Sequence, residues 1–322
     1  MLVFRHLKIR FKDYLCAHLN CCISYNMTIL GYYTFRITVF LFSLVPFKVL
    51  YVLSDILSLL FYHVIKYRKT MIMENLTKSF PELSRKEIDK ICKDSYANLS
   101  DILLEGIKGL SLNAEDILKR YQVLPNQNLD KFHENGQSVI GLTAHLTNWE
   151  WGVASCGLSL KHHVLGVYKK LSHPLINKYI FKTRDRINVT LSEMQETMII
   201  LESDHKLDPF MLMLITDQRP TDPLKAHWTK FLNRDTAFFY GAEKIALDYN
   251  YPLFYFNIRR VKRGYYEVDV VDVCNDPSGT KKGEITEIYK NLLEAEVKKR
   301  PSDWLWSHSR WKHPKPKDTT LN

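Results

Sequence analysis

The sequence predicts an α/β protein in which helices flank a mixed, mostly parallel sheet, with an apolar helical segment ahead of it. Three observations lead to this class. Short apolar runs alternate with amphipathic stretches from residue 138 onward, which is the pattern of strand–helix–strand units. Two such runs, 251–260 and 264–273, meet at the turn VKRG and predict an antiparallel pair late in the chain. Residues 37–65 carry only two fully charged side chains, whereas 25% of the whole chain is charged.

The apolar segment comes first in the chain, and we expect residues 1–68 to form an N-terminal region with a membrane anchor at about 28–65. Its two charges, Lys48 and Asp55, lie seven positions apart and therefore on one face of a helix. They interrupt the apolar run, and Pro46 predicts a kink or a helix start. A spanning helix, a monotopic anchor and a buried helical hairpin of a soluble protein all stay open at this point.

The residues on either side of the anchor do not determine its orientation in a membrane. Basic residues lie on both sides of it, so the rule that positive charge stays on the cytoplasmic side leaves the orientation open. No small-residue cleavage site follows the apolar run, and we therefore expect the anchor to be retained. Met27 is an alternative start residue to Met1.

The chain of 322 residues is 46% apolar and has a formal net charge of +10, which argues against disorder and indicates an anionic partner. Nucleic acid, acidic lipid and an acidic carrier protein are all compatible with that charge. The sequence lacks RNA-binding and zinc-finger motifs and Gly-rich nucleotide loops, so we expect neither nucleic acid nor a nucleotide cofactor. Its six cysteines show no CxxC pair and no zinc-ligand spacing, and we interpret them as reduced thiols facing a cytosol, with no metal.

Residues 81–110 have the pattern of an amphipathic helix. Ser84 is the N-cap candidate, and Glu87 three residues later completes a capping box. Beyond this helix, apolar runs of strand length alternate with stretches of helical periodicity. The expected order is a strand at 138–145, a helix at 148–160, a strand at 163–170, helices at 173–186 and 192–203, a strand at 209–217, a helix at 235–250, the two strands of the hairpin, and a helix at about 281–300.

His145 and Glu150 stand five positions apart in the stretch TAHLTNWEWG. Spacing alone proves nothing, because 12 histidines and 35 acidic residues among 322 predict about one such match by chance. A second match, His313 with Asp318, lies in a polar tail that contains prolines. The predicted strand adds weight, since it places His145 at the carboxyl end of a buried strand, where open α/β sheets bind ligands. There the ring can fold toward Glu150 at the start of the next helix.

A carboxylate bonded to one ring nitrogen of a histidine fixes the tautomer and makes the other nitrogen a better base. Such a pair can deprotonate a hydroxyl that attacks an acyl carbon, which predicts acyl transfer to an alcohol. A structural histidine in a loop is the alternative. Asp217 and Gln218 end or follow the predicted strand at 209–217, and parallel pairing with the first strand would bring them to the same sheet edge as His145. We therefore expect them to shape the site.

Several separate segments together give the chain a likeness to a known family. They are ENLTKSFPE at 74–82, HLTNWE at 145–150, TDQRP at 216–220, FFYGAEKIA at 238–246 and WLWSHSRWK at 304–312, behind the apolar anchor. With these segments, residues 30–313 resemble the late acyltransferases of lipid A biosynthesis, the lauroyl and myristoyl transferases of Gram-negative inner membranes. The resemblance implies a glycerolipid-acyltransferase-like fold, with an acyltransferase domain at 69–313 and a polar tail at 314–322.

For function, the resemblance implies transfer of a fatty acyl group from an acyl-carrier-protein thioester to a hydroxyl of a lipid A precursor, on the cytoplasmic side of the bacterial inner membrane. His145 and Glu150 match the catalytic dyad of the family. Arg310 and Lys312 also match, whereas Ser309 stands where the commoner form has an arginine. A thioester needs no metal or nucleotide to give up its acyl group, which agrees with the lack of such motifs.

Basic residues after the second predicted strand are expected to meet lipid phosphates or the phosphopantetheine of the carrier, or else to be solvated surface charges. They are Lys169, Lys170, Arg184 and Arg186. Two other functions stay open: an acyltransferase for another hydroxylated lipid or glycolipid, and a non-catalytic basic protein that binds anionic lipid through its charge. The sequence does not distinguish a carrier-protein donor from coenzyme A, nor does it fix the acyl chain length.

Overall fold

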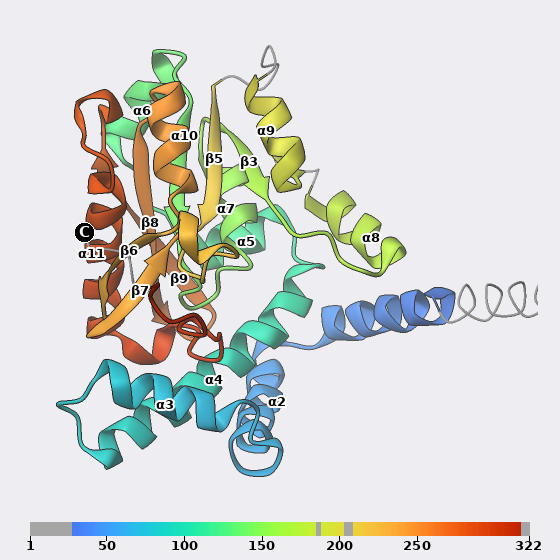
Figure 1. The fold of residues 1–322 in the computed structure, drawn as a ribbon. Coiled ribbons are helices and arrows are strands. Elements are labelled where there is room, and N and C mark those ends of the chain that lie inside the picture. Colours follow the sequence, from blue (N-terminus) through green and yellow to red (C-terminus); the bar gives the residue numbers. More distant parts are fainter. Residues whose placement is uncertain (1–27, 185–187, 203–208, 317–322) are drawn as a thin grey trace, which may run out of the picture.

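The computed structural model describes residues 28–184, 188–202 and 209–316, and their strands form a seven-stranded sheet and a separate two-stranded one. The large sheet has the order β1-β9-β8-β2-β5-β3-β4 (Figure 1). From β8 to β4 all neighbours are parallel, whereas β9 is antiparallel to β8 and pairs in parallel with β1. The mixed, mostly parallel sheet and its late hairpin are thus confirmed. The strands are β1 Tyr121–Val123, β2 Val139–Thr143, β3 His163–Val167, β4 Val189–Ser192, β5 Phe210–Ile215, β8 Leu253–Lys262 and β9 Tyr265–Cys274.

Helices pack on the sheet and along its edges. α7 (Gly152–Ser159) contacts β1 and β3, and α5 (Ala114–Arg120) packs beside it. α8 (Pro174–Arg184) and α9 (Met194–Glu202) contact the edge strand β4, while α11 (Glu284–Lys299) contacts the hairpin of β8 and β9. The remaining helices near the sheet are α6 Gln127–Glu134 and α10 Gly241–Tyr249.

The central strands β2 and β5 are buried along almost their whole length, as expected for parallel strands with both faces covered. Gly141 in β2 lies where other core side chains approach the backbone closely. A Cβ at this position would lie 3.0 Å from the ring of Phe256 and 3.1 Å from the sulfur of Met211. The glycine therefore allows the core to close over the strand.

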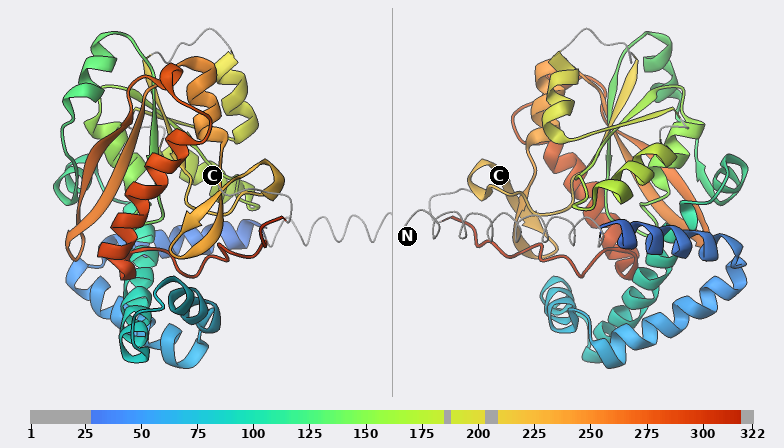
Figure 2. Two further views of the ribbon diagram at one scale, coloured as in Figure 1. Left: turned by 60° about the vertical axis from the view of Figure 1, so that its left-hand side comes forward. Right: turned by 90° about the vertical axis from the view of Figure 1, so that its right-hand side faces the viewer.

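The long helix α4 (Arg85–Gly109) confirms the amphipathic helix predicted at 81–110 and its capping box. The backbone N–H of Glu87 donates to Oγ of Ser84, and the backbone N–H of Ser84 donates to the Glu87 carboxylate at 2.7 Å. These bonds satisfy N–H groups that a first helical turn leaves without partners. Figures 1 and 2 show α4 running from the sheet to a group of helices that includes α2 (Phe47–Leu59) and α3 (Lys69–Ser79).

The predicted anchor consists of two helices. One covers Thr28–Leu44, and α2 begins at Phe47 and continues through a π-helical turn, Leu60–Ile65. Pro46 separates them, because its φ of −63° and ψ of 147° are extended. The stretch Phe47–Ile65 is long and apolar enough to cross a membrane, judged by length and composition alone.

Only one face of α2 is bound to the rest of the protein. Leu50 and Ser54 are fully buried, and Asp55 forms an ion pair with Arg263 at 2.7 Å. Most of the exposed surface of this helix and its π-helical turn is apolar, with Lys48 and His63 as exposed polar residues among it. The exposed apolar residues are Val49, Val52, Leu53, Ile56, Leu59, Leu60, Val64 and Ile65.

The helix predicted at 235–250 is wrong in its first part. Arg234–Phe238 forms strand β7, which pairs in antiparallel with β6 (His227–Phe231), and α10 begins only at Gly241. The turn residues Leu232 and Asn233 have φ values of 50° and 64°, as a two-residue hairpin turn requires. Strand β6 was not predicted from the sequence, and without this partner the segment 235–238 has no local pattern typical of a strand. The short strands β1 and β4 were missed as well.

Candidate active site

The neighbouring strands β2 and β5 end at the same edge of the sheet. Thr143, the last residue of β2, pairs with Ile215, the last residue of β5. His145 and Asp217 each follow two residues later, so parallel pairing brings together two residues that are 72 positions apart in the sequence. The helix after β2 begins at Gly152, later than predicted, and His145 lies in the connecting loop as expected.

The Asp217 carboxylate holds His145 by its ring and by its backbone. Oδ1 of Asp217 lies 2.7 Å from Nδ1 of the His145 ring. Oδ2 accepts the backbone N–H of His145 at 3.1 Å and the indole N–H of Trp304 at 2.8 Å. Asp217 is only 2% exposed, so these donors replace the water that the carboxylate has lost. The ring is thereby fixed with Nδ1 toward Asp217 and Nε2 on the opposite side.

Each partner of this pair favours the charged form of the other. Burial alone would lower the pKa of His145, but the charge of Asp217 and its hydrogen bond outweigh burial and hold that pKa above the ordinary 6.5. Burial alone would raise the pKa of Asp217, but His145 and the Trp304 donor bring it below 3.8. Asp217 is therefore a carboxylate at neutral pH and makes His145 a stronger base.

Nε2 of His145 faces the side-chain amide of Gln218, whose nitrogen lies 3.0 Å away. The ring also makes an edge contact with Trp149, with centroids 4.9 Å apart. The His145 side chain keeps 16% of its surface exposed. An amide N–H at this place is also a suitable donor to a negatively charged oxygen.

Glu150 lies on the exposed turn between His145 and α7. Its Oε1 accepts the indole N–H of Trp149 at 3.2 Å. Its charge also raises the pKa of His145, but by less than Asp217 does. The carboxylate bonded to the ring of His145 is that of Asp217, and the role predicted for Glu150 stays a prediction.

The loop that carries His145 is pinned by the segment that follows α11. Leu146 forms an isolated antiparallel bridge with Trp304, and the backbone N–H of Thr147 donates to the carbonyl of Asp303 at 2.8 Å. Thr147 is fully buried and has a φ of 43°, a left-handed conformation that is costly for a β-branched residue. Backbone strain is therefore stored two residues from His145.

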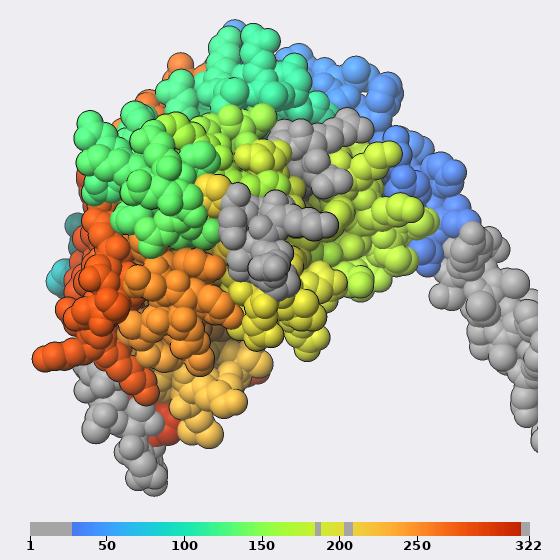
Figure 3. All heavy atoms as spheres, turned by 90° about the horizontal axis from the view of Figure 1, so that it is seen from above, coloured from blue at the N-terminus to red at the C-terminus, as the bar shows by residue number. Residues whose placement is uncertain are grey.

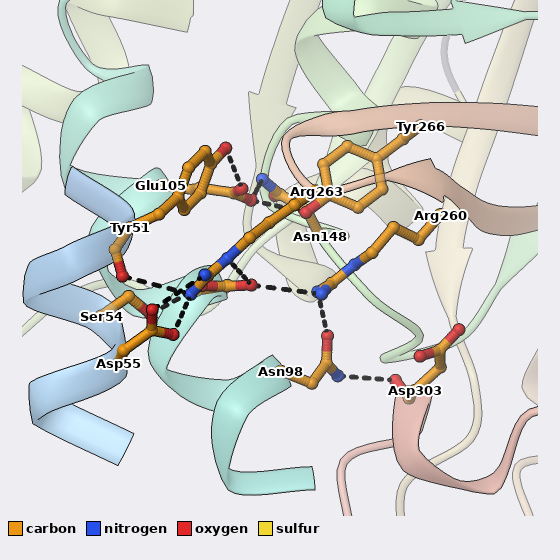
Figure 4. Close-up of polar contacts among 11 residues, drawn as sticks. Tyr51, Ser54, Asp55, Asn98, Glu105, Asn148, Arg260, Arg263, Tyr266 and Asp303 are labelled. Atoms are coloured by element: carbon orange, nitrogen blue, oxygen red, sulfur yellow. Dashed lines mark hydrogen bonds and ion pairs between the residues drawn. The ribbon is translucent and has the colours of Figure 1, made fainter. Parts of the chain in front are cut away.

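A buried carboxylate of α4 supports the same loop. Glu105 accepts the side-chain amide of Asn148 at 2.7 Å, the hydroxyl of Tyr266 at 2.7 Å and the hydroxyl of Tyr51 at 2.8 Å (Figure 4). Trp151 donates its indole N–H to the backbone carbonyl of Glu105 at 3.0 Å. Burial raises the pKa of the Glu105 carboxyl, and the two tyrosine hydroxyls partly oppose that effect.

Glu105 is part of a larger polar cluster, defined here as Asp101 together with the residues labelled in Figure 4, which connects α2 to the β8–β9 hairpin. Within it, Asp101 accepts hydrogen bonds from Ser54 at 2.6 Å, from Arg263 at 2.7 Å and from Arg260 at 3.2 Å. The helix with the exposed apolar face is therefore linked, through side-chain hydrogen bonds, to the loop that carries His145.

The other residues singled out from the sequence lie elsewhere. Lys169 is exposed after β3, and its neighbour Lys170 pairs with Glu193 at 3.3 Å. The side chain of Arg184 and the whole of Arg186 lie outside the described residues. Among the described residues, neither Lys169 nor Lys170 forms a hydrogen bond or an ion pair with His145 or Asp217.

Arg310 is buried, with 3% of its surface exposed, and its guanidinium lies 4.7 Å from the ring centroid of Phe238. Its nitrogens have no hydrogen-bond partner within the part of the chain that the structure describes. Burial lowers the pKa of Arg310 to about 10, and the charge of Asp217 opposes this. Ser309 accepts a hydrogen bond from Arg219 at 2.8 Å, so the serine at the position of the usual arginine is bound to the TDQRP segment.

Sequence reasoning missed two participants of the site. Trp304 had no role in the site predicted from the sequence, yet it donates to Asp217. Asn148 lies inside the HLTNWE segment, but its partner Glu105 is 43 positions away. The sequence near Trp304 and Asn148 offers one sign of these roles: a buried indole N–H or side-chain amide needs a hydrogen-bond partner. Over the described ranges, no three His, Cys, Asp or Glu side chains are grouped so as to hold a metal ion.

Comparison with known proteins gives one clear result. A family model described as "Bacterial lipid A biosynthesis acyltransferase" matches residues 23–313. No curated protein matches the sequence. Because the match spans most of the chain, the protein belongs to this family, which confirms the resemblance drawn from the sequence segments and points to an acyltransferase.

Proposed function

We propose that the protein moves a fatty acyl group from an acyl-carrier-protein thioester to a hydroxyl of a lipid A precursor, with His145 as the general base. The observation that carries the proposal is the contact of His145 with Asp217 at the ends of two parallel strands, in a chain whose family points to acyl transfer. A histidine oriented by a buried carboxylate is an arrangement that activates hydroxyl nucleophiles.

In the proposed reaction, Nε2 of His145 takes the proton of the acceptor hydroxyl while the hydroxyl oxygen bonds to the thioester carbon. The electron pair of the carbonyl moves onto its oxygen and forms a tetrahedral oxyanion. When the carbonyl forms again, the carbon–sulfur bond breaks, and the leaving thiolate takes the proton from His145. The products are an ester and a free carrier thiol. Asp217 stabilises the imidazolium that exists between the two steps.

Two further side chains have proposed roles in this reaction. Gln218 donates its amide N–H to the oxyanion, since that amide already lies 3.0 Å from Nε2 of His145. Glu150 adds negative potential that favours the imidazolium, in keeping with its effect on the pKa of His145. The dyad implied by the family resemblance is thus proposed to work as a group of three, with Asp217 in contact and Glu150 at longer range.

We also propose that α2 lies in the surface of the bacterial inner membrane, with the active site on the cytoplasmic side. The support is that one face of α2 is exposed and apolar while the other binds the domain through Tyr51, Ser54 and Asp55. A helix fixed to its domain along one face suits the membrane interface better than a transmembrane position. The net charge of +10 favours anionic headgroups.

The test is acyl transfer from carrier thioesters of several chain lengths to a lipid A precursor in detergent. His145→Ala is expected to lower kcat by about 10²–10⁴-fold, the range for loss of a general base, in a protein that is still folded at the assay temperature. His133→Ala, on α6, is the matched control and should keep full activity. Full transfer by His145→Ala would contradict the proposal.

Two outcomes would favour the alternatives. Transfer to another hydroxylated lipid or glycolipid, but not to the lipid A precursor, would keep the mechanism and change the acceptor. Salt-sensitive binding to anionic vesicles, with no transfer to any acceptor and no effect of His145→Ala, would favour a non-catalytic lipid-binding protein.

A further inference from the structure

A cleft of about 1020 Å³ lies beside the candidate active site, bounded by the Thr28–Leu44 helix and by α8. Figure 3 shows these two segments next to each other on one face of the molecule. Glu150 and Trp151, from the turn that follows His145, also line the cleft. The cleft therefore reaches from the N-terminal helix to the turn beside the proposed base.

Three cationic side chains line this cleft: Arg36, Lys178 and Lys182. Lys178 and Lys182 lie one helical turn apart and therefore on one face of α8. Arg36 is fixed at the wall, because Nη1 donates to the hydroxyl of Tyr32 at 3.0 Å and the guanidinium lies 4.8 Å from the ring centroid of Tyr179. Arginine and lysine side chains gathered in this way are typical of phosphate recognition.

The rest of the cleft wall is mixed, with Ser111, Asn113, Glu150 and Thr183 as polar residues beside an apolar part. The apolar residues include Leu110, Leu112, Ile117, Trp151, Ala154 and Leu175. A cleft that combines three cations with a partly apolar wall suits an amphiphile whose headgroup carries phosphate. The outer surface of the Thr28–Leu44 helix also carries apolar side chains. The exposed ones include Leu30, Tyr33, Ile37, Phe40, Leu41 and Leu44.

We infer that this cleft binds the phosphorylated sugar headgroup of the acceptor lipid, with Arg36, Lys178 and Lys182 contacting its phosphate. The inference rests on the proposed function and adds a subsite to it. A lipid held in the membrane reaches the cleft along the apolar surface of the Thr28–Leu44 helix. Glu150, in the cleft wall, accepts from Trp149, whose ring contacts that of His145, so the cleft lies close to the proposed base.

The experiment compares a phosphorylated acceptor with the same acceptor after removal of its phosphate, using the full-length chain in detergent. The test variant is the double change Lys178→Gln with Lys182→Gln. The matched control, Lys298→Gln with Lys299→Gln, removes the same charge from exposed positions at the end of α11. Initial rates give kcat and KM for the acceptor, and separately KM for the carrier thioester.

The double variant is expected to raise KM for the phosphorylated acceptor about tenfold and to leave KM for the thioester unchanged, because two charge-assisted contacts are lost. Removal of the phosphate should raise KM of the unchanged protein by a similar factor, and the two losses should not be additive. Additive losses would overturn the inference. A rise in KM for the thioester, with KM for the acceptor unchanged, would also overturn it, because the cations would then contact the carrier.

A binding measurement separates this inference from the proposed function. Equilibrium binding of the phosphorylated acceptor is measured for His145→Ala with and without the two lysine substitutions. If the unchanged protein fails to acylate this acceptor, the proposed function fails, and binding still decides about the cleft. Weaker binding by at least about fivefold in the lysine variant supports the cleft, and equal binding overturns it.

Discussion

Asp217 and Glu105 are both buried carboxylates beside the loop that carries His145, but their pKa values are shifted in opposite directions. Asp217 contacts an imidazole and an indole N–H, and its pKa lies below the ordinary value. Glu105 accepts from two tyrosine hydroxyls and one amide, and burial raises its pKa. Asp217 supplies a fixed negative charge to the proposed base, whereas Glu105 joins α2, the β8–β9 hairpin and the loop of His145 through hydrogen bonds. Burial alone does not determine the charge of a carboxylate, because the kind of donor that replaces water decides it.

Asp217→Asn should have the largest effect on activity. We expect kcat/KM to fall about 10²–10³-fold, because an amide does not stabilise the imidazolium of His145. In the proposed mechanism His145 accepts a proton only when it is neutral, so we expect activity to fall as pH drops through its pKa, which stands above 6.5. Without the Asp217 charge this acid limb should move to lower pH in a profile of kcat/KM against pH. Asp222→Asn, an exposed change nearby, is the control, and an unmoved limb would contradict the role of Asp217.

Glu105→Ala should have the largest effect on stability. We expect a loss of about 3–5 kcal/mol in the free energy of unfolding, because the change opens a cavity and leaves Tyr51, Tyr266 and Asn148 without their shared acceptor. Glu105→Gln keeps the shape and should cost about 1 kcal/mol. Denaturant unfolding measures both. A Glu105→Gln protein of normal stability that loses activity as severely as Asp217→Asn would remove the distinction between the two carboxylates.

Glu150→Gln should have a smaller effect than Asp217→Asn. Since Glu150 contributes less than Asp217 to the raised pKa of His145, we expect kcat/KM to fall by about tenfold or less, with a small shift of the acid limb to lower pH. The same kinetic profile measures it, with the exposed change Glu134→Gln on α6 as control. A loss as large as that of Asp217→Asn would make Glu150 an equal partner of His145, as the family resemblance implies.

The smallest expected effect is the pH dependence of stability. The pKa of Glu105 is raised above 4.5, so its contribution to stability is fully present below pH 4.5 and is lost as pH rises through the folded pKa. The pKa of Asp217 is lowered, so its contribution is present above pH 3.8 and is lost as pH falls through the folded pKa. Relative to Glu105→Gln, the unchanged protein should therefore lose stability as pH rises from 4.5 through the raised pKa of Glu105, and denaturant unfolding at a series of pH values measures this loss. If the difference in the free energy of unfolding between the unchanged protein and Glu105→Gln stays constant with pH, Glu105 keeps its ordinary pKa.

Predictions from the sequence succeeded where the cause of a structure is local. The capping box of Ser84 and Glu87, the hairpin that turns at Gly264 and the loop position of His145 all follow from neighbouring residues. The prediction for 235–250 failed because β7 becomes a strand by pairing with β6, and the analysis did not identify β6. The helix start predicted at Pro46 is confirmed, but the contacts of α2 with Arg263 and Asp101 were not foreseeable from spacing.

The sequence by itself determined the class of fold, the family, and the position of His145 at the end of a buried strand, because periodicity, turn residues and short segments are properties of neighbouring residues. The tertiary structure decided which carboxylate contacts the ring. Asp217 reaches His145 only because β2 and β5 are adjacent and in register, and Glu105 reaches Asn148 only because α4 packs beneath the loop. Strand order and helix packing depend on the whole core, and a local pattern does not contain them.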